Sequence, residues 1–238
     1  MKVRLRAGTS GFSFSEWKGP FYPEKLPAKD MLSFYAGRFS TVEINNTFYR
    51  MPNEALVQGW AAQVPEGFTF AIKAPQRITH IKRLKECAEP LSILFRIIGT
   101  LGGRLGPVLF QLPPNFRKDV PRLEAFFAAM PAERPRRIAM EYRHASWFDD
   151  ETFAAMRAHG VALCVADTGE EPVAPLAATA DFGYLRLRRE TFDDAELAAW
   201  AKRIDEQPWS DAWVFLKHEE EGRGPKLAAR LLEIVEGK

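Results

Sequence analysis

The sequence predicts a (β/α)8 barrel of the TIM type, in which a closed sheet of parallel strands lies inside a ring of helices. Eight short apolar runs alternate with helical patterns at a spacing of roughly 30 residues, as this barrel requires. Most runs end in a charged or amide residue, although a strand buried on both faces should be apolar throughout. In this barrel the carboxyl ends of the strands converge on one mouth, where active sites lie. An open, doubly wound sheet is the alternative.

The first four strand–helix units occupy residues 3–130. Each strand is an apolar run rich in β-branched and aromatic residues, bounded by turn-forming residues. The predicted strands are VRLRAG (3–8), TVEINN (41–46), FTFAIKAP (68–75) and PVLFQLPP (107–114). The helices expected after them lie at 31–39, 54–63, about 82–102 and 121–130. Several of these helices follow Asp, Asn or Pro, which favour helix starts.

The last four units occupy residues 137–237 and include one irregular member. The predicted strands are RIAMEYRH (137–144), VALCVAD (161–167), FGYLRLR (182–188) and AWVFLKH (212–218). The helices expected after the fifth, seventh and eighth strands lie at 150–160, 193–204 and 224–237. The segment after the sixth strand is only weakly helical and contains two prolines, so its helix is expected to be degraded.

Composition places the chain among ordinary globular proteins. Residues 1–238 are expected to form one domain, with 46% hydrophobic and 27% charged residues. The apolar stretches are strand-sized and no charged-then-apolar leader pattern is seen, which predicts a cytoplasmic protein without membrane contact. Cys87 and Cys164 are expected to be free thiols. The net charge of +2 includes no basic block, so contact with nucleic acid would need a local patch, and no protein partner is implied.

The polar residues at the strand ends are expected to face the barrel interior. Side chains alternate along a strand, and a charge buried against the helices would cost several kcal/mol. This parity places three carboxylates in the mouth, and on the sixth strand it groups Asp167 with Leu163 and Val165. The set comprises Glu43, Glu141 and Asp167, the cations Lys73, Arg143, Arg186, Arg188 and Lys217, and the amides Asn45 and Gln111. The excess of cations favours an anionic ligand; the alternative is an ion-pair lattice that plugs the barrel.

The loops after the strands supply further candidates. The loop GTSGFSFSEWKGPFYP (8–23) carries Ser10 and five aromatics, including Trp17, which either form a lid core or stack on a flat ligand. Its glycines make a backbone anion nest conceivable. Other loop candidates are Tyr49 after the second strand, His80 after the third, and His144 and Trp147 after the fifth. The GRGP turn at 222–225 either directs a helix N-terminus toward a phosphate or serves only as a helix start.

Four other chemistries use residue types found among these candidates. Glu43, Glu141, Asp167, His144 and His218 are suitable metal ligands, but no tight motif joins them and five cations would repel a divalent ion, so a metal is not favoured. Glu43 and Glu141 could form the acid–base pair of a glycosidase if their separation allows it. Lys73 or Lys217 could form a Schiff base in a dry barrel, whereas Ser10 lacks an identifiable partner as a nucleophile.

Several long strings together resemble the YecE-like family, a domain of unknown function. They are GTSGFSFSEWKGPFYP, VEINNTFYRMP, FAIKAPQRITH, LGPVLFQLPPNF, MEYRHASW and WVFLKHE, followed by GP. The resemblance covers nearly the full chain, implies a TIM-type barrel and leaves the activity open. The residues that match the family's motifs are Thr9, Ser10, Gly11, Trp17, Glu43, Asn45, Tyr49, Lys73, His80, Gln111, Glu141, Arg143, His144, Trp147 and Asp167.

Two positions depart from that family's pattern. The seventh strand of the family usually ends in His-Gly, where this chain has Arg188 and Arg189. The eighth usually ends in two asparagines, where this chain has Lys217, His218 and two glutamates. Ligand contacts from the last two strands are therefore expected to differ, with a more charged mouth.

These observations support three functional hypotheses. The first is an enzyme acting on a phosphate-bearing substrate, such as a nucleotide or nucleic-acid fragment, with Glu43, Glu141 and Asp167 as catalytic carboxylates. Arg143, Arg186 and Lys217 would hold the phosphate. The second is a barrel that binds an anionic metabolite without turnover, in which all three carboxylates should be paired with cations. The third is an interaction protein with a vestigial site.

Overall fold

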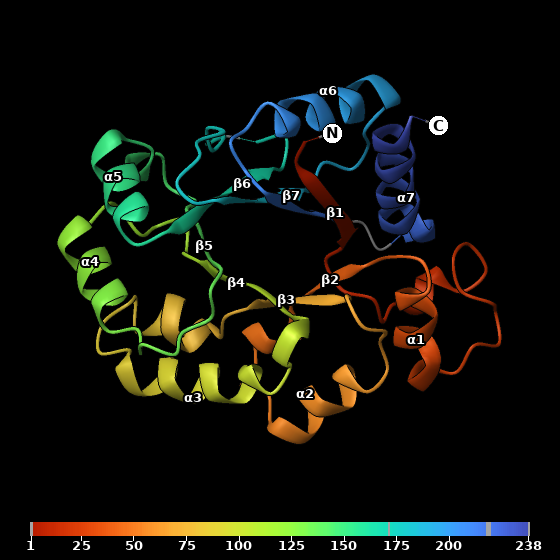
Figure 1. Cartoon of the computed structure of the whole chain (residues 1–238), viewed down its shortest axis with the longest axis horizontal. Helices are drawn as coiled ribbons and strands as arrows, with labels where there is room; N and C mark the ends of the chain where they lie inside the picture. Colours follow the sequence, from red (N-terminus) through yellow and green to blue (C-terminus); the bar gives the residue numbers. More distant parts are fainter. Residues whose placement is uncertain (1, 171, 218–219, 238) are drawn as a thin grey trace.

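Eight parallel strands form a barrel in the computed structural model, which describes residues 2–170, 172–217 and 220–237 (Figure 1). Neighbouring strands pair in the order β1-β8-β7-β6-β5-β4-β3-β2. The strands are β1 (Arg4–Thr9), β2 (Thr41–Ile44), β3 (Thr69–Lys73), β4 (Leu105–Gln111), β5 (Ile138–Glu141), β6 (Val161–Asp167), β7 (Phe182–Leu187) and β8 (Asp211–Leu216). The predicted α/β barrel of the TIM type is confirmed.

Helices surround this sheet on its outer side (Figure 1). They are α1 (Met31–Ala36), α2 (Glu54–Ala61), α3 (Ala88–Gly99), α4 (Val120–Ala128), α5 (Asp150–Ala158), α6 (Asp194–Asp205) and α7 (Arg223–Glu236). Among the described residues between β6 and β7 the backbone forms no helix. The degraded sixth helix expected from the two prolines is therefore replaced by an irregular segment.

Barrel closure takes place between β1 and β2, and Gly8 permits it. A Cβ atom on Gly8 would lie 2.2 Å from the Thr41 carbonyl oxygen, so no larger residue fits at this crossing. The buried Tyr35 hydroxyl bridges the two strands, because it accepts from Thr9 N at 2.8 Å and donates to the Thr41 carbonyl at 3.0 Å. Further along, Gly11 N donates to the Glu43 carbonyl at 2.8 Å. Closure thus brings the loop after β1 against the end of β2.

Side-chain caps fix the starts of several helices. Asn53, Asp119 and Asp149 each accept a hydrogen bond from a backbone N–H in the first turn of α2, α4 and α5. At α6, Asp193 and Glu196 form a reciprocal capping box. Because each cap lies at the end of a strand-to-helix loop, it also fixes the length of that loop at the mouth of the barrel.

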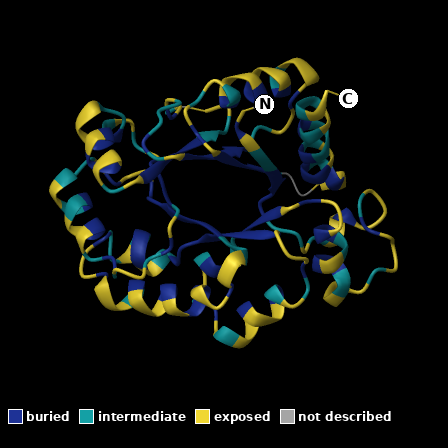
Figure 2. Ribbon diagram, viewed as in Figure 1, coloured by how far each residue is buried: buried dark blue, intermediate teal, exposed yellow. Residues whose placement is uncertain are grey.

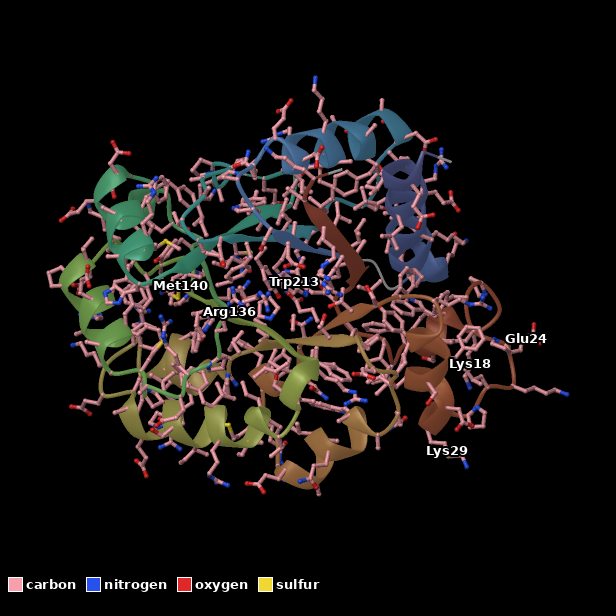
Figure 3. All side chains as sticks on the ribbon, viewed as in Figure 1. Lys18, Glu24, Lys29, Arg136, Met140 and Trp213 are labelled. Atoms are coloured by element: carbon pink, nitrogen blue, oxygen red, sulfur yellow. The ribbon has the colours of Figure 1, made fainter. Side chains whose placement is uncertain are left out.

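Two apolar layers separate the inside of the barrel from its outer shell. The strands are buried along almost their whole length, whereas the helices expose their outer faces (Figure 2). Side chains fill the ring of strands, with Trp213 among them, while Lys18, Glu24 and Lys29 lie at the outer side of the loop after β1 (Figure 3). The inner layer consists of Ala71, Leu109, Ala139, Ala162, Cys164, Phe182, Tyr184, Trp213 and Phe215. The parity expected for β3, β4, β5, β7 and β8 matches this layer.

On β6 the expected parity is wrong. Ala162 and Cys164 belong to the inner layer, whereas Leu163 and Val165 pack with the outer core. Asp167 shares the parity of Leu163 and Val165, so it lies on the outer side of the strand. This strand is apolar on both faces, which means that alternation alone carries no information about which face is inside.

Two smaller expectations concern cysteines and membranes. Cys87 and Cys164 are both buried and free, as predicted. Within the described ranges, none of the helices combines the length and the apolar character that crossing a bilayer demands.

Candidate functional site

A single guanidinium holds two carboxylates inside the mouth of the barrel. Arg186 Nη2 donates to Glu43 Oε1 at 2.8 Å, and Arg186 Nη1 donates to Glu141 Oε2 at 2.7 Å. Arg186 and Glu43 are both 0% exposed. Their strands, β7, β2 and β5, lie on different sides of the barrel, and inward parity brings the three side chains together. All three residues were expected in the mouth from the sequence, but no sequence pattern shows that one arginine serves both carboxylates.

Neutral donors complete what we call the Arg186 network. Tyr184 OH donates to Glu43 Oε2 at 2.7 Å, and Asn45 Nδ2 donates to Glu43 Oε1 at 3.0 Å. Gln111 Nε2 donates to Glu141 Oε1 at 2.6 Å. Every carboxylate oxygen of the pair therefore accepts at least one hydrogen bond, which is what a buried charge requires. We define the Arg186 network as Glu43, Asn45, Gln111, Glu141, Tyr184 and Arg186.

Both glutamates of this network are ionised. Burial by itself raises the pKa of Glu43, but the charges of Arg186 and Arg188 and the hydrogen bonds outweigh it and lower the pKa to about 2. Burial also raises the pKa of Glu141, but the charges of Arg186 and Arg188 and the hydrogen bonds outweigh it, so this pKa is lowered as well. The acid of a glycosidase pair needs a raised pKa instead. The lowered pKa of both glutamates therefore argues against Glu43 and Glu141 as the acid–base pair of a glycosidase.

A cavity of about 460 Å³ opens beside the network, and we call it the mouth cavity. Its volume is in the range of small-molecule sites, which span roughly 300–1,000 Å³. Its lining comprises the cations Lys73, Arg188 and Lys217, the polar Ser10, Ser13, Asn45 and Asn46, and Gly11, Phe12, Phe14, Ile44 and Tyr49. Three cations and no carboxylate line this cavity among the described residues. The arrangement combines a positive field with aromatic surfaces.

Lys73 contributes a buried amine to this cavity. The side chain comes from the end of β3, the residue is 9% exposed, and Nζ lies 4.0 Å from the centroid of the Phe48 ring. Within the described part of the chain, Nζ has no hydrogen-bond or ion-pair partner. Burial and the nearby Arg186 charge lower the pKa of Lys73 to about 8, although Glu141 and Glu43 oppose this effect. The amine is therefore partly neutral near physiological pH.

Ser10, which also lines the mouth cavity, carries a hydroxyl without a hydrogen-bond partner among the described residues. The residue is 4% exposed, and its Oγ has no hydrogen-bond partner in the described structure. A buried hydroxyl without a partner is uncommon in folded proteins and calls for an explanation. Ser10 lies where β1 bridges to Glu43, directly before Gly11, whose φ of +99° turns the chain over the cavity. A ligand oxygen in the mouth cavity would satisfy this hydroxyl.

Most aromatics of the loop after β1 form a lid core and not a stacking surface. Trp17 is 1% exposed and packs against Phe14, Phe21 and Tyr22 at centroid distances of 4.8–6.0 Å. Phe21 in turn contacts Phe34 and Tyr35 of α1, and Phe39 shortly after that helix. Only Phe12 and Phe14 of this loop's aromatics line the cavity. The structure thus does not bring Trp17 to the site as a binding residue.

Of the three candidates after β5, two have structural roles and one lies at the rim of the barrel mouth. Trp147 is fully buried, stacks on Tyr142 and donates from Nε1 to the Phe116 carbonyl at 2.6 Å. His144 caps the short turn Ala145–Trp147, where Ser146 N donates to its Nδ1. Arg143 lies at the exposed rim, with Nε 4.0 Å from Glu141 Oε1. Of these, only Arg143 is linked to the Arg186 network.

Of the two remaining loop candidates, only Tyr49 lines the mouth cavity. Tyr49 is 75% exposed at its edge, which leaves one ring face open to a ligand. His80 lies in a single π-helical turn, Arg77–Ile81, and its ring meets Phe48 edge-on at 4.9 Å. Such turns often mark functional positions. Burial and the Lys73 and Arg143 charges lower the pKa of His80, so its ring is neutral at pH 7.

Asp167 does not lie in the mouth with Glu43 and Glu141, so the expectation that it faces the barrel interior was wrong. Its Oδ2 pairs with Arg189 Nε at 3.1 Å, and Arg189 Nη1 also pairs with Glu196 of the α6 capping box at 2.7 Å. Because β6 has the opposite parity to the one expected, the carboxylate points to the outer loops. Asp167 therefore ties the end of β6 to the start of α6.

The described residues contain no cluster of side chains suited to bind a metal ion. No group of three His, Cys, Asp or Glu side chains in the described ranges lies close enough to hold an ion. His218, one of the ligands considered from the sequence, lies outside the described residues. Glu219 does as well.

Three residues of the site were missed or underrated by the sequence analysis. Tyr184 is not among the predicted site residues, yet it donates directly to Glu43. Phe48, which covers the Lys73 amine, was read only as part of a loop string. Arg188 was assigned to the mouth but not to ligand binding, yet it lines the cavity. Tyr184 shares the inward-facing parity of Arg186, and this parity was the signal in the sequence that could have identified it. No local pattern marks Phe48.

The fold and this site define a class: a (β/α)8 barrel with a cationic, aromatic-lined cavity at its carboxyl-terminal mouth. A family model described as protein of unknown function DUF72 matches residues 6–238. The chain belongs to this family, which confirms the resemblance found in the sequence.

Individual relatives agree with this membership. The chain is 31% identical over 118 residues to UPF0759 protein YecE of Escherichia coli strain K12; this stretch is 49% of the chain and 43% of YecE. It is 25% identical to UPF0759 protein YunF of Bacillus subtilis strain 168, with 90% of each chain covered. A crystal structure of a DUF72 family protein from Thermotoga maritima superposes with a TM-score of 0.85 at 28% identity, covering 98% of this chain and 99% of the other.

Proposed function

We propose that this chain is an enzyme that acts on a phosphate-bearing substrate, a nucleotide or a nucleic-acid fragment, in the mouth cavity. One observation carries the proposal: Lys73, Arg188 and Lys217 line the cavity without a carboxylate among the described lining residues. Phosphate oxygens are strong acceptors that match such donors. Phe12, Phe14 and Tyr49 provide surfaces on which a base or sugar can pack.

The Arg186 network lies beside the mouth cavity and contributes to the electrostatic field there. Two ionised glutamates hold Arg186 in place, so its charge is already balanced and it is a poor clamp for a further anion. The phosphate is therefore assigned to Arg188 and Lys217, with Arg143 at the rim and Lys73 beside them in the cavity. Glu43 and Glu141 act by fixing the field of the mouth, and Lys73 is the group whose pKa allows it to gain or lose a proton near pH 8.

Ligand-dependent stability tests the anion site directly. Inorganic phosphate and AMP should raise the melting temperature of the full chain, whereas ribose should not. At a ligand concentration 100 times Kd, about 2.7 kcal/mol of stabilisation is expected, which corresponds to roughly 5–10 °C for a domain of this size. Lys217→Gln should weaken the effect, and Lys202→Gln on the exposed face of α6 is the matched control. Equal melting temperatures with and without phosphate would contradict the site.

A binding barrel without turnover is the second candidate function, and one observation favours it. All three carboxylates proposed as catalytic are paired with arginines: Glu43 and Glu141 with Arg186, and Asp167 with Arg189. Release of phosphate or nucleoside from a panel of phosphomonoesters and phosphodiesters separates the two functions. Turnover that Glu141→Gln leaves intact would exclude Glu141 from the reaction, including a role in fixing the field of the mouth. Binding without any turnover would favour the second candidate.

A further inference from the structure

The mouth cavity contains one amine whose surroundings differ from those of an ordinary phosphate-binding lysine. Lysines that bind phosphate are usually hydrated or ion-paired point charges. Lys73 is instead 9% exposed, faces an aromatic ring at 4.0 Å and, in the described structure, has neither a hydrogen bond nor an ion pair. Lys217, the other lysine of the cavity, is only half-buried.

We infer that the Lys73 amine forms an imine with an aldehyde or ketone that carries a phosphate or other anionic group. The inference rests on the proposed function, since Arg188 and Lys217 would hold the anion while the carbonyl reaches Lys73. Amines that form imines are activated by desolvation or by a neighbouring cation. Lys73 has both, because Phe48 covers Nζ and Arg186 lies close enough to affect its protonation.

The chemistry needs no co-reactant. The neutral Nζ attacks the carbonyl carbon, the carbonyl oxygen takes up a proton and nitrogen loses one, which gives a carbinolamine. Loss of the hydroxyl group as water then leaves a C=N bond to Lys73. The cavity opens to solvent, so protons and the released water can exchange with the bulk. A volume of about 460 Å³ admits a small phosphorylated carbonyl compound.

Reductive trapping with pyridoxal 5′-phosphate tests the inference. The full chain is incubated at pH 8 with this phosphorylated aldehyde or with pyridoxal, reduced with borohydride, digested and mapped by mass spectrometry. Lys202 of α6, whose side chain is 79% exposed, provides the internal reference. At pH 8 about half of Lys73 is neutral, against well under 1% for a lysine of ordinary pKa. Lys73 labelling by the phosphorylated aldehyde should therefore exceed Lys202 labelling by about tenfold or more.

Three controls make the result decisive. Excess inorganic phosphate should abolish the preference for Lys73, and pyridoxal should show about twofold preference at most, since it lacks the anion. Lys73→Arg keeps the positive charge and should lose the adduct at this position while keeping the melting temperature within a few degrees. Labelling confined to exposed lysines, or equal labelling by the two aldehydes, would overturn the inference. If phosphate still stabilised the chain, the proposed anion site would survive that failure.

Discussion

The two ends of the barrel contain charge clusters of opposite composition. At the carboxyl ends of the strands, the single cation Arg186 holds Glu43 and Glu141 in full burial. At the amino ends, the single carboxylate Asp211 is approached by three arginines. We call this second group the Asp211 cluster; it consists of Arg4, Arg6, Arg137 and Asp211. Arg4 pairs with Asp211 at 2.6 Å while its own side chain is 66% exposed.

The difference between the ends lies in access to water. Arg6 and Arg137 lie over the Trp213 ring at 5.7 and 4.8 Å, so the Asp211 cluster caps the apolar inner layer while its arginines remain partly solvated. In the Arg186 network, Arg186, Glu43 and Glu141 are at most 3% exposed, so these charges depend on the hydrogen bonds of the network. Buried ion pairs are seldom more stable than apolar packing. Stability alone therefore does not account for the buried ion pairs beneath the mouth cavity.

Removal of Arg186 should have the largest effect. Arg186→Met removes the guanidinium that two buried carboxylates share, which should lower the free energy of unfolding by about 3–5 kcal/mol. Urea denaturation measures the change. Arg186→Met with Glu43→Gln and Glu141→Gln is the matched control and should recover most of the loss, because no uncompensated charge remains. A loss below about 1 kcal/mol in the single variant would remove the contrast between the two ends.

Replacement of Lys73 should act in the opposite direction. The folded pKa of about 8 lies below the ordinary value of 10.5, so the charged amine destabilises the folded state at pH 7. This cost is fully present below pH 8 and disappears as the pH rises toward 10.5. Lys73→Met should therefore be more stable than the wild type by about 2 kcal/mol at pH 7, with a smaller gain at pH 10. An equal gain at both values would show that Lys73 titrates normally.

Neutralisation of Asp211 should be milder than removal of Arg186. Asp211→Asn keeps the size of the side chain and leaves three arginines that can turn toward water, so a loss of about 1–2 kcal/mol is expected. Added salt should reduce the difference from the wild type, because these arginines are partly exposed. Chemical denaturation at low and high salt measures both effects. A loss as large as that of Arg186→Met would contradict the comparison.

The smallest effect is expected at Arg4. Its guanidinium pairs with Asp211 from the solvent side, and Arg6 and Arg137 remain as partners after its removal. Arg4→Gln should change the free energy of unfolding by about 0.5 kcal/mol or less. Measured beside Asp211→Asn, this variant shows whether the exposed member of the cluster contributes. A loss above about 2 kcal/mol would show that the amino end is as desolvated as the mouth.

The sequence predicted the barrel and most inward-facing residues, because polar residues at strand ends reveal parity. Glu43, Glu141 and Arg186 were assigned correctly to the mouth on this basis. Asp167 was not, because β6 is apolar on both faces and its terminal charge points to a loop. Trp17 was left between two interpretations, since a short aromatic-rich loop has the same composition whether it packs internally or binds a ligand. The partners of each charge come from distant strands, which no local pattern specifies.

The sharing of Arg186 also bears on the order in which the barrel can form. Glu43 and Glu141 precede Arg186 by 143 and 45 residues, so both glutamates leave the ribosome before their counter-charge exists. Until β7 is in place, burial of either carboxylate is opposed by its desolvation. We therefore expect the first five strands to reach their final packing only once β7 has joined them. Through one arginine, the packing of two glutamates from the second and fifth strands depends on the seventh.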